Sequence, residues 1–196
     1  MLITALSDET EADIENQLSC FKKLGIAFIE LQNFDNIPQL KEDLDKHNIK
    51  VSAIRGGNTE IAKSLDCKYI ISEFENTDDD ITFLFENQTE SIEECLKILE
   101  SSDVKMLFNP ANFVLCGEDV KKAFDALLPY IEYVRITDVL KNGRYVPAGA
   151  GDCEIRYIVN TLKNRGFDGF LSIEHRLGKN DEQTLLFALN SFKIIM

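Results

Sequence analysis

Short apolar segments alternate with amphipathic segments along the whole chain. Most of the apolar segments are apolar at nearly every position, as expected for strands of a parallel sheet that is covered on both faces. The predicted strands are residues 2–6, 27–31, 50–54, 68–74, 81–86, 105–109, 133–137 and 170–174. The segments between them predict helices, with Gly25 ending the first, Pro38 in the first turn of the second and Thr89 beginning the one after the fifth strand.

Repeated strand–helix units predict the fold. Eight of them, beginning with a strand and ending with a helix, indicate an α/β protein with a compact closed (β/α)8 barrel, in a single domain spanning residues 1–196. The joint between residues 74 and 81 is only "ENTDDD", which is too short for a crossover helix. We therefore expect the helix between strands four and five to be missing or very short. A hairpin at this joint, giving a mixed and open sheet, is the alternative.

A barrel strand without its own helix would expose apolar side chains. We expect either a second subunit, and hence a homodimer, or a neighbouring helix to cover this flank.

The chain of 196 residues has a formal net charge of −13, which disfavours binding to nucleic acid because phosphates are repelled. No apolar run is long enough to span a membrane, and the N-terminus lacks the features of a signal peptide, so we expect a cytoplasmic protein without membrane contact. The five cysteines are far apart and form no C-x-x-C motif, and there are only two histidines. A disulfide framework and a histidine-rich metal site are therefore not indicated.

Polar residues follow the predicted strands at their carboxyl ends, which is where a (β/α)8 barrel carries its site. These residues are Glu30, Arg55, Glu73, Glu86, Asn87, Asn109, Asn112, Arg135, Asp138, Glu174 and His175. Lys141, six residues after Arg135, is a further candidate for contact with an anionic group. Together they predict a site for a small polar ligand. We expect a structural role for His175, because its side chain should point away from the face that carries Glu174.

Several of these residues lie in motifs that resemble a known family. The segments "LGIAFIELQ", "FLFENQTES", "MLFNPANFVLCG", "IEYVRITD", "YVPAGAGDCEI" and "LKNRGFDGFLSIEH" are similar, in this order, to the xylose isomerase-like barrels. That family contains sugar phosphate isomerases and epimerases, with endonuclease IV as a distant relative. The resemblance implies a small carbohydrate or sugar phosphate as the ligand.

The resemblance also implies a divalent metal (Mn, Mg or Zn), held by a Glu, an Asp, a His and a Glu after or on strands five to eight. Glu86 and Glu174 match the two glutamates, but Asn109 stands in the Asp position and Arg135 in the His position. A guanidinium cannot ligate a cation because it is permanently charged and has no acceptor atom. We expect Asn109 to offer a carbonyl oxygen and Arg135 to bridge the two glutamates. The cofactor is then either none or a metal held only by Glu86 and Glu174.

Two interpretations of the site remain open. In the first, the protein is an isomerase or epimerase in which Glu86 and Glu174 transfer a proton next to a carbonyl. The substrate-binding residues would be Arg135, Asn109, Asn112, Asp138, Glu30, Arg55 and Lys141. In the second, the chain is a non-catalytic relative that binds a sugar-like ligand or has a structural role, and Arg135 with its glutamates is an internal ion network. Endonuclease activity is disfavoured because the histidine cluster and the basic surface that it needs are missing.

Overall fold

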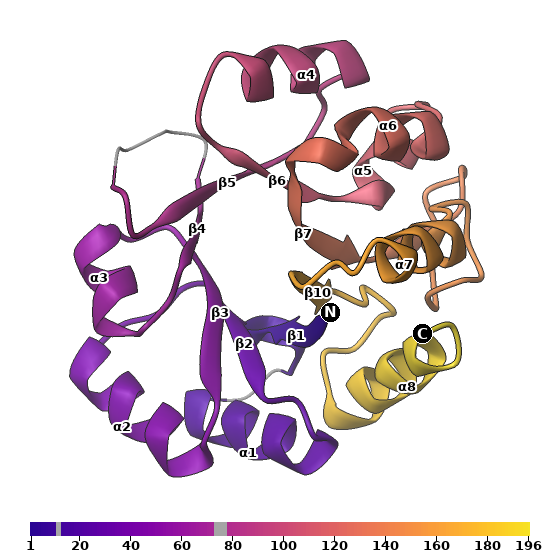
Figure 1. Ribbon diagram of the computed structural model, residues 1–196. Coiled ribbons are helices and arrows are strands. Elements are labelled where there is room, and N and C mark those ends of the chain that lie inside the picture. Colours follow the sequence, from indigo (N-terminus) through magenta and orange to yellow (C-terminus); the bar gives the residue numbers. More distant parts are fainter. Residues whose placement is uncertain (11–12, 73–77) are drawn as a thin grey trace.

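The computed structural model describes residues 1–10, 13–72 and 78–196. Within them, parallel strands close into a barrel in the order β1–β10–β7–β6–β5–β4–β3–β2 (Figure 1). The eight barrel strands are β1 (Leu2–Leu6), β2 (Phe28–Leu31), β3 (Lys50–Arg55), β4 (Tyr69–Ile71), β5 (Thr82–Glu86), β6 (Lys105–Phe108), β7 (Ile131–Ile136) and β10 (Phe170–Ile173). The predicted closed (β/α)8 barrel is confirmed.

The helices surround the barrel on the outside (Figure 1). They are the 3-10 turn η1 (Ser7–Glu9), α1 (Ile14–Leu24), α2 (Ile37–His47), α3 (Thr59–Ser64), α4 (Ile92–Glu100), α5 (Pro110–Leu115), α6 (Val120–Leu127), the 3-10 turn η2 (Leu128–Tyr130), α7 (Ile155–Asn164) and α8 (Glu182–Lys193). No helix in the described ranges has the length and apolar character needed to cross a membrane.

Strands β4 and β5 are parallel neighbours, paired through Tyr69 with Thr82 and Ile71 with Leu84. The alternative of a hairpin at this joint is therefore wrong. Residue 72 and residues 78–81, the described part of the connection, contain no helix, which agrees with the expected missing helix.

Ile70, Phe83 and Phe85, the side chains of β4 and β5 in the outer apolar layer, are at most 8% exposed in the single chain. A second subunit is therefore not needed to cover this flank, and a homodimer remains only a prediction.

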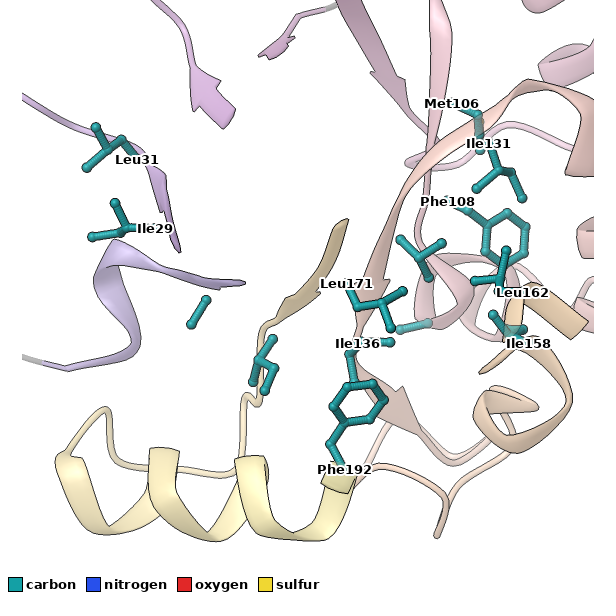
Figure 2. Packing of buried hydrophobic residues seen from close by; sticks show 14 of the residues in the cluster. Ile29, Leu31, Met106, Phe108, Ile131, Ile136, Ile158, Leu162, Leu171 and Phe192 are labelled. Atoms are coloured by element: carbon teal, nitrogen blue, oxygen red, sulfur yellow. The ribbon is translucent and has the colours of Figure 1, made fainter. Parts of the chain in front are cut away.

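Apolar side chains fill the space on both sides of the barrel wall. On the outside, Ile158 and Leu162 of α7 and Phe192 of α8 pack against strand residues such as Ile136 (Figure 2). On the inside, Tyr69, Tyr133 and Phe170 contact one another with ring centroids 5.6–6.1 Å apart. These three rings fill part of the barrel interior.

Some element boundaries differ from the sequence-based predictions. Helix α4 begins after Ser91, whose side chain accepts a hydrogen bond from the Glu94 N–H while Glu94 bonds back to Ser91, so the predicted start at Thr89 is wrong. This reciprocal arrangement is a capping box, which satisfies N–H groups of the first turn. Helix α1 begins after Asp13 and is preceded by the separate turn η1 at residues 7–9.

A short helix and a short hairpin were not predicted. Helix α5 follows β6 directly, with Asn109 as its N-cap and Pro110 in its first turn. The polar loop after β7 contains a two-stranded antiparallel hairpin, β8 (Asp138–Val139) and β9 (Tyr145–Val146). Strand β4 ends at Ile71, before the predicted end, and residues 73–74 of that prediction lie outside the described residues.

Candidate active site

Arg135 lies on β7 with its side chain inside the barrel, where it is 1% exposed. Its guanidinium forms a two-pronged pair with Glu30 of β2: Nη1 donates to Oε2 at 2.5 Å and Nη2 donates to Oε1 at 2.8 Å. Such forked pairs fix both direction and distance. Burial opposes the charge of Arg135, but Glu30, Glu86 and Glu174 outweigh burial and raise the pKa of the guanidinium further above its ordinary value.

A chain of hydroxyl groups holds Glu30 in place. Its Oε2 accepts hydrogen bonds from Ser172 Oγ at 2.7 Å and from Tyr133 Oη at 3.1 Å. Tyr133 Oη lies 3.0 Å from Ser52 Oγ, which lies 2.8 Å from Thr4 Oγ1. Because all these groups are buried and bonded, Glu30 is an internal counter-charge and not a group that is open to a ligand.

The remaining nitrogen of Arg135 faces the two glutamates that the sequence singled out. Nε lies 3.5 Å from Glu86 Oε1 and 3.6 Å from Glu174 Oε2. It is buried and has no hydrogen-bond partner within the described part of the chain. The expectation that Arg135 bridges Glu86 and Glu174 therefore fits these distances. The shortest contacts of Arg135 are with Glu30, however, and the sequence did not predict that pair.

Glu86, at the end of β5, is held by three neighbours. Arg55 at the end of β3 binds Oε2 through Nη2, and Asn109 Nδ2 donates to Oε1 at 2.9 Å. Burial disfavours the ionised form, but the charges of Arg135 and Arg55 and the bond from Asn109 outweigh it and lower the pKa of Glu86. Glu86 is therefore an ionised carboxylate next to a rim arginine that is about one-third exposed.

Glu174 directly follows β10 and is held by a second rim arginine. Arg176 donates to Oε1 from Nε at 2.8 Å and from Nη2 at 2.6 Å, and Thr137 Oγ1 donates to Oε2 at 3.1 Å. Arg176 also reaches Tyr145 of β9, donating from Nη1 to the hydroxyl at 3.1 Å. Sequence reasoning missed Arg176, although its position two residues after Glu174 was the signal that could have found it.

Three asparagines connect the ends of β5 and β6. Asn87 and Asn109 exchange two side-chain-to-backbone bonds of 3.0 Å, and Asn112 Nδ2 donates to the Asn87 carbonyl at 2.7 Å. The side-chain oxygen Oδ1 of Asn109 accepts the Ala111 N–H at 3.2 Å, and its side-chain NH₂ donates to Glu86. The expectation that Asn109 offers an oxygen at the ligand position is therefore wrong, because that oxygen caps α5.

The structure does not bring Asp138 and Lys141 into this group. The carboxylate of Asp138 accepts the N–H groups of Gly149, Gly151 and Cys153 at 2.8–3.1 Å and so anchors the loop after the β8–β9 hairpin. Lys141 is exposed beside that hairpin, and its N–H bonds to Asp152. Glu73, another predicted site residue, lies outside the described residues.

His175 points away from Glu174, as expected, and forms a buried pair with Glu9 of η1. Its Nε2 lies 2.7 Å from Glu9 Oε2, and its Nδ1 accepts the Leu177 N–H at 3.1 Å. Burial raises the pKa of Glu9, and the contact with His175 opposes this rise. The pair connects the segment after β1 to the segment after β10 and thereby fixes the chain next to Glu174.

A cavity of about 320 Å³ opens between η1, α1 and the loop after β2. Asp8, Gln32 and Phe34 are among its lining residues, and Gln32 Nε2 donates to Asp8 Oδ2 at 2.9 Å. Amides, carboxylates and an aromatic ring are the groups that bind sugar hydroxyls and the apolar face of a sugar ring. Sequence reasoning did not single out these residues.

The residues at this site do not fit the divalent metal that the family pattern implies. Arg135 places a permanent positive charge within 3.6 Å of both glutamates, and Asn109 turns its NH₂ toward Glu86. Across the described ranges, no group of three or more His, Cys, Asp and Glu side chains is arranged to hold a metal ion. Glu86 and Glu174, the predicted metal ligands, are instead bound by arginines.

Comparison with solved structures identifies several barrels of the same shape. D-allulose 3-epimerase from Methylomonas sp. is 12% identical with a TM-score of 0.78, covering 100% of this chain and 98% of that chain. The E. coli 3-keto-D-glucoside 4-epimerase YcjR is 14% identical with a TM-score of 0.77, covering 99% of each chain. The IOLI protein with a bound zinc atom is 15% identical with a TM-score of 0.77, covering 100% of this chain and 98% of that chain.

At these identities the likeness establishes the fold alone. No curated protein matches the chain. The model of one protein family, described as xylose isomerase-like TIM barrel, matches residues 60–193, which is more than half of the chain. The protein therefore belongs to the xylose isomerase-like TIM barrel family.

Proposed function

We propose that this protein is an isomerase or epimerase of a small carbohydrate, free or phosphorylated, and that Glu86 and Glu174 exchange a proton at the carbon next to the carbonyl. The observation that carries the proposal is the approach of both carboxylates to the same nitrogen, the Arg135 Nε, at 3.5 and 3.6 Å. Paired carboxylates at the carboxyl ends of barrel strands are suited to removing and returning a proton. Family membership supports the carbohydrate as ligand.

Each residue of the pair has a role in this reaction. Glu86, ionised beside its arginines, removes the proton, and the C–H electron pair moves into the carbonyl to give an enediolate. In an epimerase, Glu174 takes up a proton from solvent during the reaction and passes it to the opposite face of the same carbon. In an isomerase the proton goes to the neighbouring carbon while a hydroxyl proton moves between the oxygens. The fixed charge of Arg135 stabilises the negative oxygen.

The rim contacts suggest how a ligand is held. Arg55 binds Glu86 through one nitrogen and is about one-third exposed, so it can also reach an oxygen of the ligand. Arg176, about half exposed, is placed in the same way beside Glu174. Asn109 donates to the Glu86 carboxylate, and Asn112 donates to the Asn87 carbonyl, so these side chains connect the end of β5 to the segment after β6.

A second function is favoured by a specific observation. Both carboxylates are already bound by arginines, and ion pairing of this kind weakens a base because it stabilises the ionised form. This arrangement is also what a carbohydrate-binding relative without turnover would have. Ligand binding would then replace the rim contacts of Arg55 and Arg176 without proton transfer.

Proton exchange with solvent separates the two functions. The protein would be incubated in D₂O with ketoses, aldoses and their phosphates, and ¹H NMR would follow the C–H signal next to each carbonyl. An isomerase or epimerase replaces that proton with deuterium, and Glu86→Gln or Glu174→Gln should slow the exchange at least about 100-fold.

Lys141→Ala, outside the site, is the matched control and should exchange like the wild type. Saturable binding of a sugar without exchange would establish the non-catalytic function. Neither binding nor exchange with any sugar of the panel would overturn both.

A further inference from the structure

Arg135 is surrounded by three carboxylates inside the barrel mouth. We propose that its guanidinium is the permanent cation of this site, and that Glu30, Glu86 and Glu174 form a pocket shaped for a guanidinium and not for a metal ion. The pocket should therefore select a free guanidinium-type cation when the Arg135 side chain is removed. This inference concerns charge and shape, so it holds whether or not the protein turns over a sugar.

The charges at the site are balanced only if Arg135 is counted. Glu30, Glu86 and Glu174 supply three negative charges, which Arg55, Arg135 and Arg176 match one for one. The rim arginines each bind a single glutamate. Among the residues that the structure describes, Arg135 is the only cation with ion-pair contacts within 4 Å to all three. Without it, the three carboxylates would share two partly exposed counter-charges, and Glu30 would keep only hydroxyl partners.

Arg135 is fully enclosed, whereas Arg55 and Arg176 are partly exposed to solvent. Its Nη1 and Nη2 are both bonded to Glu30, and Nη1 also reaches Ser172 Oγ at 3.0 Å. The side chain is 1% exposed, compared with 36% for Arg55 and 51% for Arg176. A permanent cation that cannot leave excludes a second cation from the same space, because like charges at such separations in a buried site repel strongly.

The spacing of the carboxylates matches the planar fork of a guanidinium. Two oxygens of Glu30 meet two nitrogens on one edge at 2.5 and 2.8 Å, and one oxygen each from Glu86 and Glu174 faces the Nε corner. A metal ion needs its oxygens converging on one point at about 2.0–2.6 Å. Oxygens distributed around a flat ion with five donors do not converge in this way.

Removal of the side chain tests the proposal. In Arg135→Ala, thermal unfolding and isothermal titration would be followed with ethylguanidinium chloride and, separately, with MnCl₂. We expect ethylguanidinium to bind the variant at least about 10-fold more tightly than the wild type, and at least about 10-fold more tightly than Mn²⁺ binds the variant.

Glu30→Gln in the Arg135→Ala background should weaken this binding, because it removes the forked partner. Arg165→Ala, which removes an exposed arginine at the end of α7, is the matched control and should behave like the wild type.

Two outcomes overturn the proposal. One is a folded Arg135→Ala protein that binds ethylguanidinium no better than the wild type or prefers Mn²⁺. The other is stoichiometric Mn²⁺ binding by the wild type, seen by electron paramagnetic resonance and lost in Glu86→Gln.

If Arg135→Ala does not fold, the double variant Arg135→Gln with Glu30→Gln, which removes both charges and keeps both lengths close, should fold and bind neither cation. Tight Mn²⁺ binding by this variant would contradict the assigned role of Glu30. Stoichiometric Mn²⁺ binding by the wild type would still overturn the proposal in that case.

Discussion

At the scale of the residue, Glu86 gives the clearest pH dependence. Its pKa in the folded chain lies below the ordinary carboxyl value of 4.5, because the arginine charges and the Asn109 bond outweigh burial. A lowered pKa stabilises the folded state above the unfolded pKa, and this stabilisation is lost as the pH falls through the folded value. Below about pH 4.5, the wild type should therefore lose a contribution that Glu86→Gln never has.

Urea denaturation from pH 7 to pH 3 measures this contribution. Glu86→Gln should be less stable than the wild type at pH 7, and the difference in unfolding free energy should shrink toward pH 3. Glu93→Gln, on the exposed side of α4, is the control and should follow the wild type. A constant difference across the whole range would contradict the assigned shift.

The sequence predicted which residues gather at the mouth better than it predicted their partners. The carboxyl ends of the strands placed Glu86, Glu174 and Arg135 correctly, because a barrel brings those ends together. The pairing of Arg135 with Glu30 depends on how far each side chain extends across the barrel, which no local pattern encodes. The direction of the Asn109 amide depended on α5, a helix that was not predicted.

At the scale of the element, the capping box of α4 makes a prediction about local stability. Ser91→Ala removes the side-chain acceptor for the Glu94 N–H and should lower the unfolding free energy by about 1 kcal/mol, within a range of about 0.5–2. Thr89→Ala alters the residue that the sequence suggested as the helix start and should have much less effect. Chemical denaturation of both variants measures the contrast, and equal losses would argue against Ser91 as the cap.

The β8–β9 hairpin makes a second prediction, about Asp138. Asp138→Asn replaces one acceptor oxygen by a donor among the three N–H groups of Gly149, Gly151 and Cys153. The loss of charge-assisted hydrogen bonds should lower the unfolding free energy by about 1.5–3 kcal/mol. If Asp138 only anchors this loop, the folded variant should keep the wild-type affinity for any sugar ligand found in the NMR panel. Lost affinity in a fully folded variant would restore Asp138 as a ligand contact.

Long periodic elements were predicted more reliably than short ones. The barrel strands and the long helices have enough apolar positions to show their period. Helix α5 has six residues directly after a strand, and β8 and β9 have two residues each. Neither the helix nor the hairpin is long enough to show a periodic pattern of apolar positions. Both are held by hydrogen bonds between residues more than ten positions apart, those of Asp138 at the hairpin and the bond from the Asn109 N–H to Asn87 at the start of α5.

At the scale of the whole molecule, the net charge of −13 predicts a response to salt. Excess charge of one sign destabilises a compact chain by self-repulsion, and salt screens it with a Debye length of about 10 Å at 0.1 M. Raising NaCl from about 20 to about 200 mM should therefore raise the unfolding temperature. Each 1 kcal/mol gained corresponds to about 2–4 °C for a chain of this size.

Differential scanning calorimetry measures this effect. Wild type and Glu30→Gln should gain equally, because a buried ion pair is screened little by salt. A fall in unfolding temperature with NaCl would mean that attractive surface pairs outweigh the repulsion.

Closure of the barrel followed from counting the repeats. Eight units of strand and helix can close into a barrel, and the joint at residues 75–80 could be crossed by extended chain. How the flank of β4 and β5 is covered could not be read from the sequence, because it depends on packing among distant segments.

The buried guanidinium of Arg135 also determines when the site acquires its central positive charge. Because the positive charge belongs to the polypeptide, translation delivers it in a one-to-one ratio and folding installs it. Barrels that depend on a bound ion must be loaded after synthesis, compete for that ion and can be filled with the wrong one. Under the proposed arrangement, a cell starved of manganese or zinc would still produce every copy of this protein with its central charge in place.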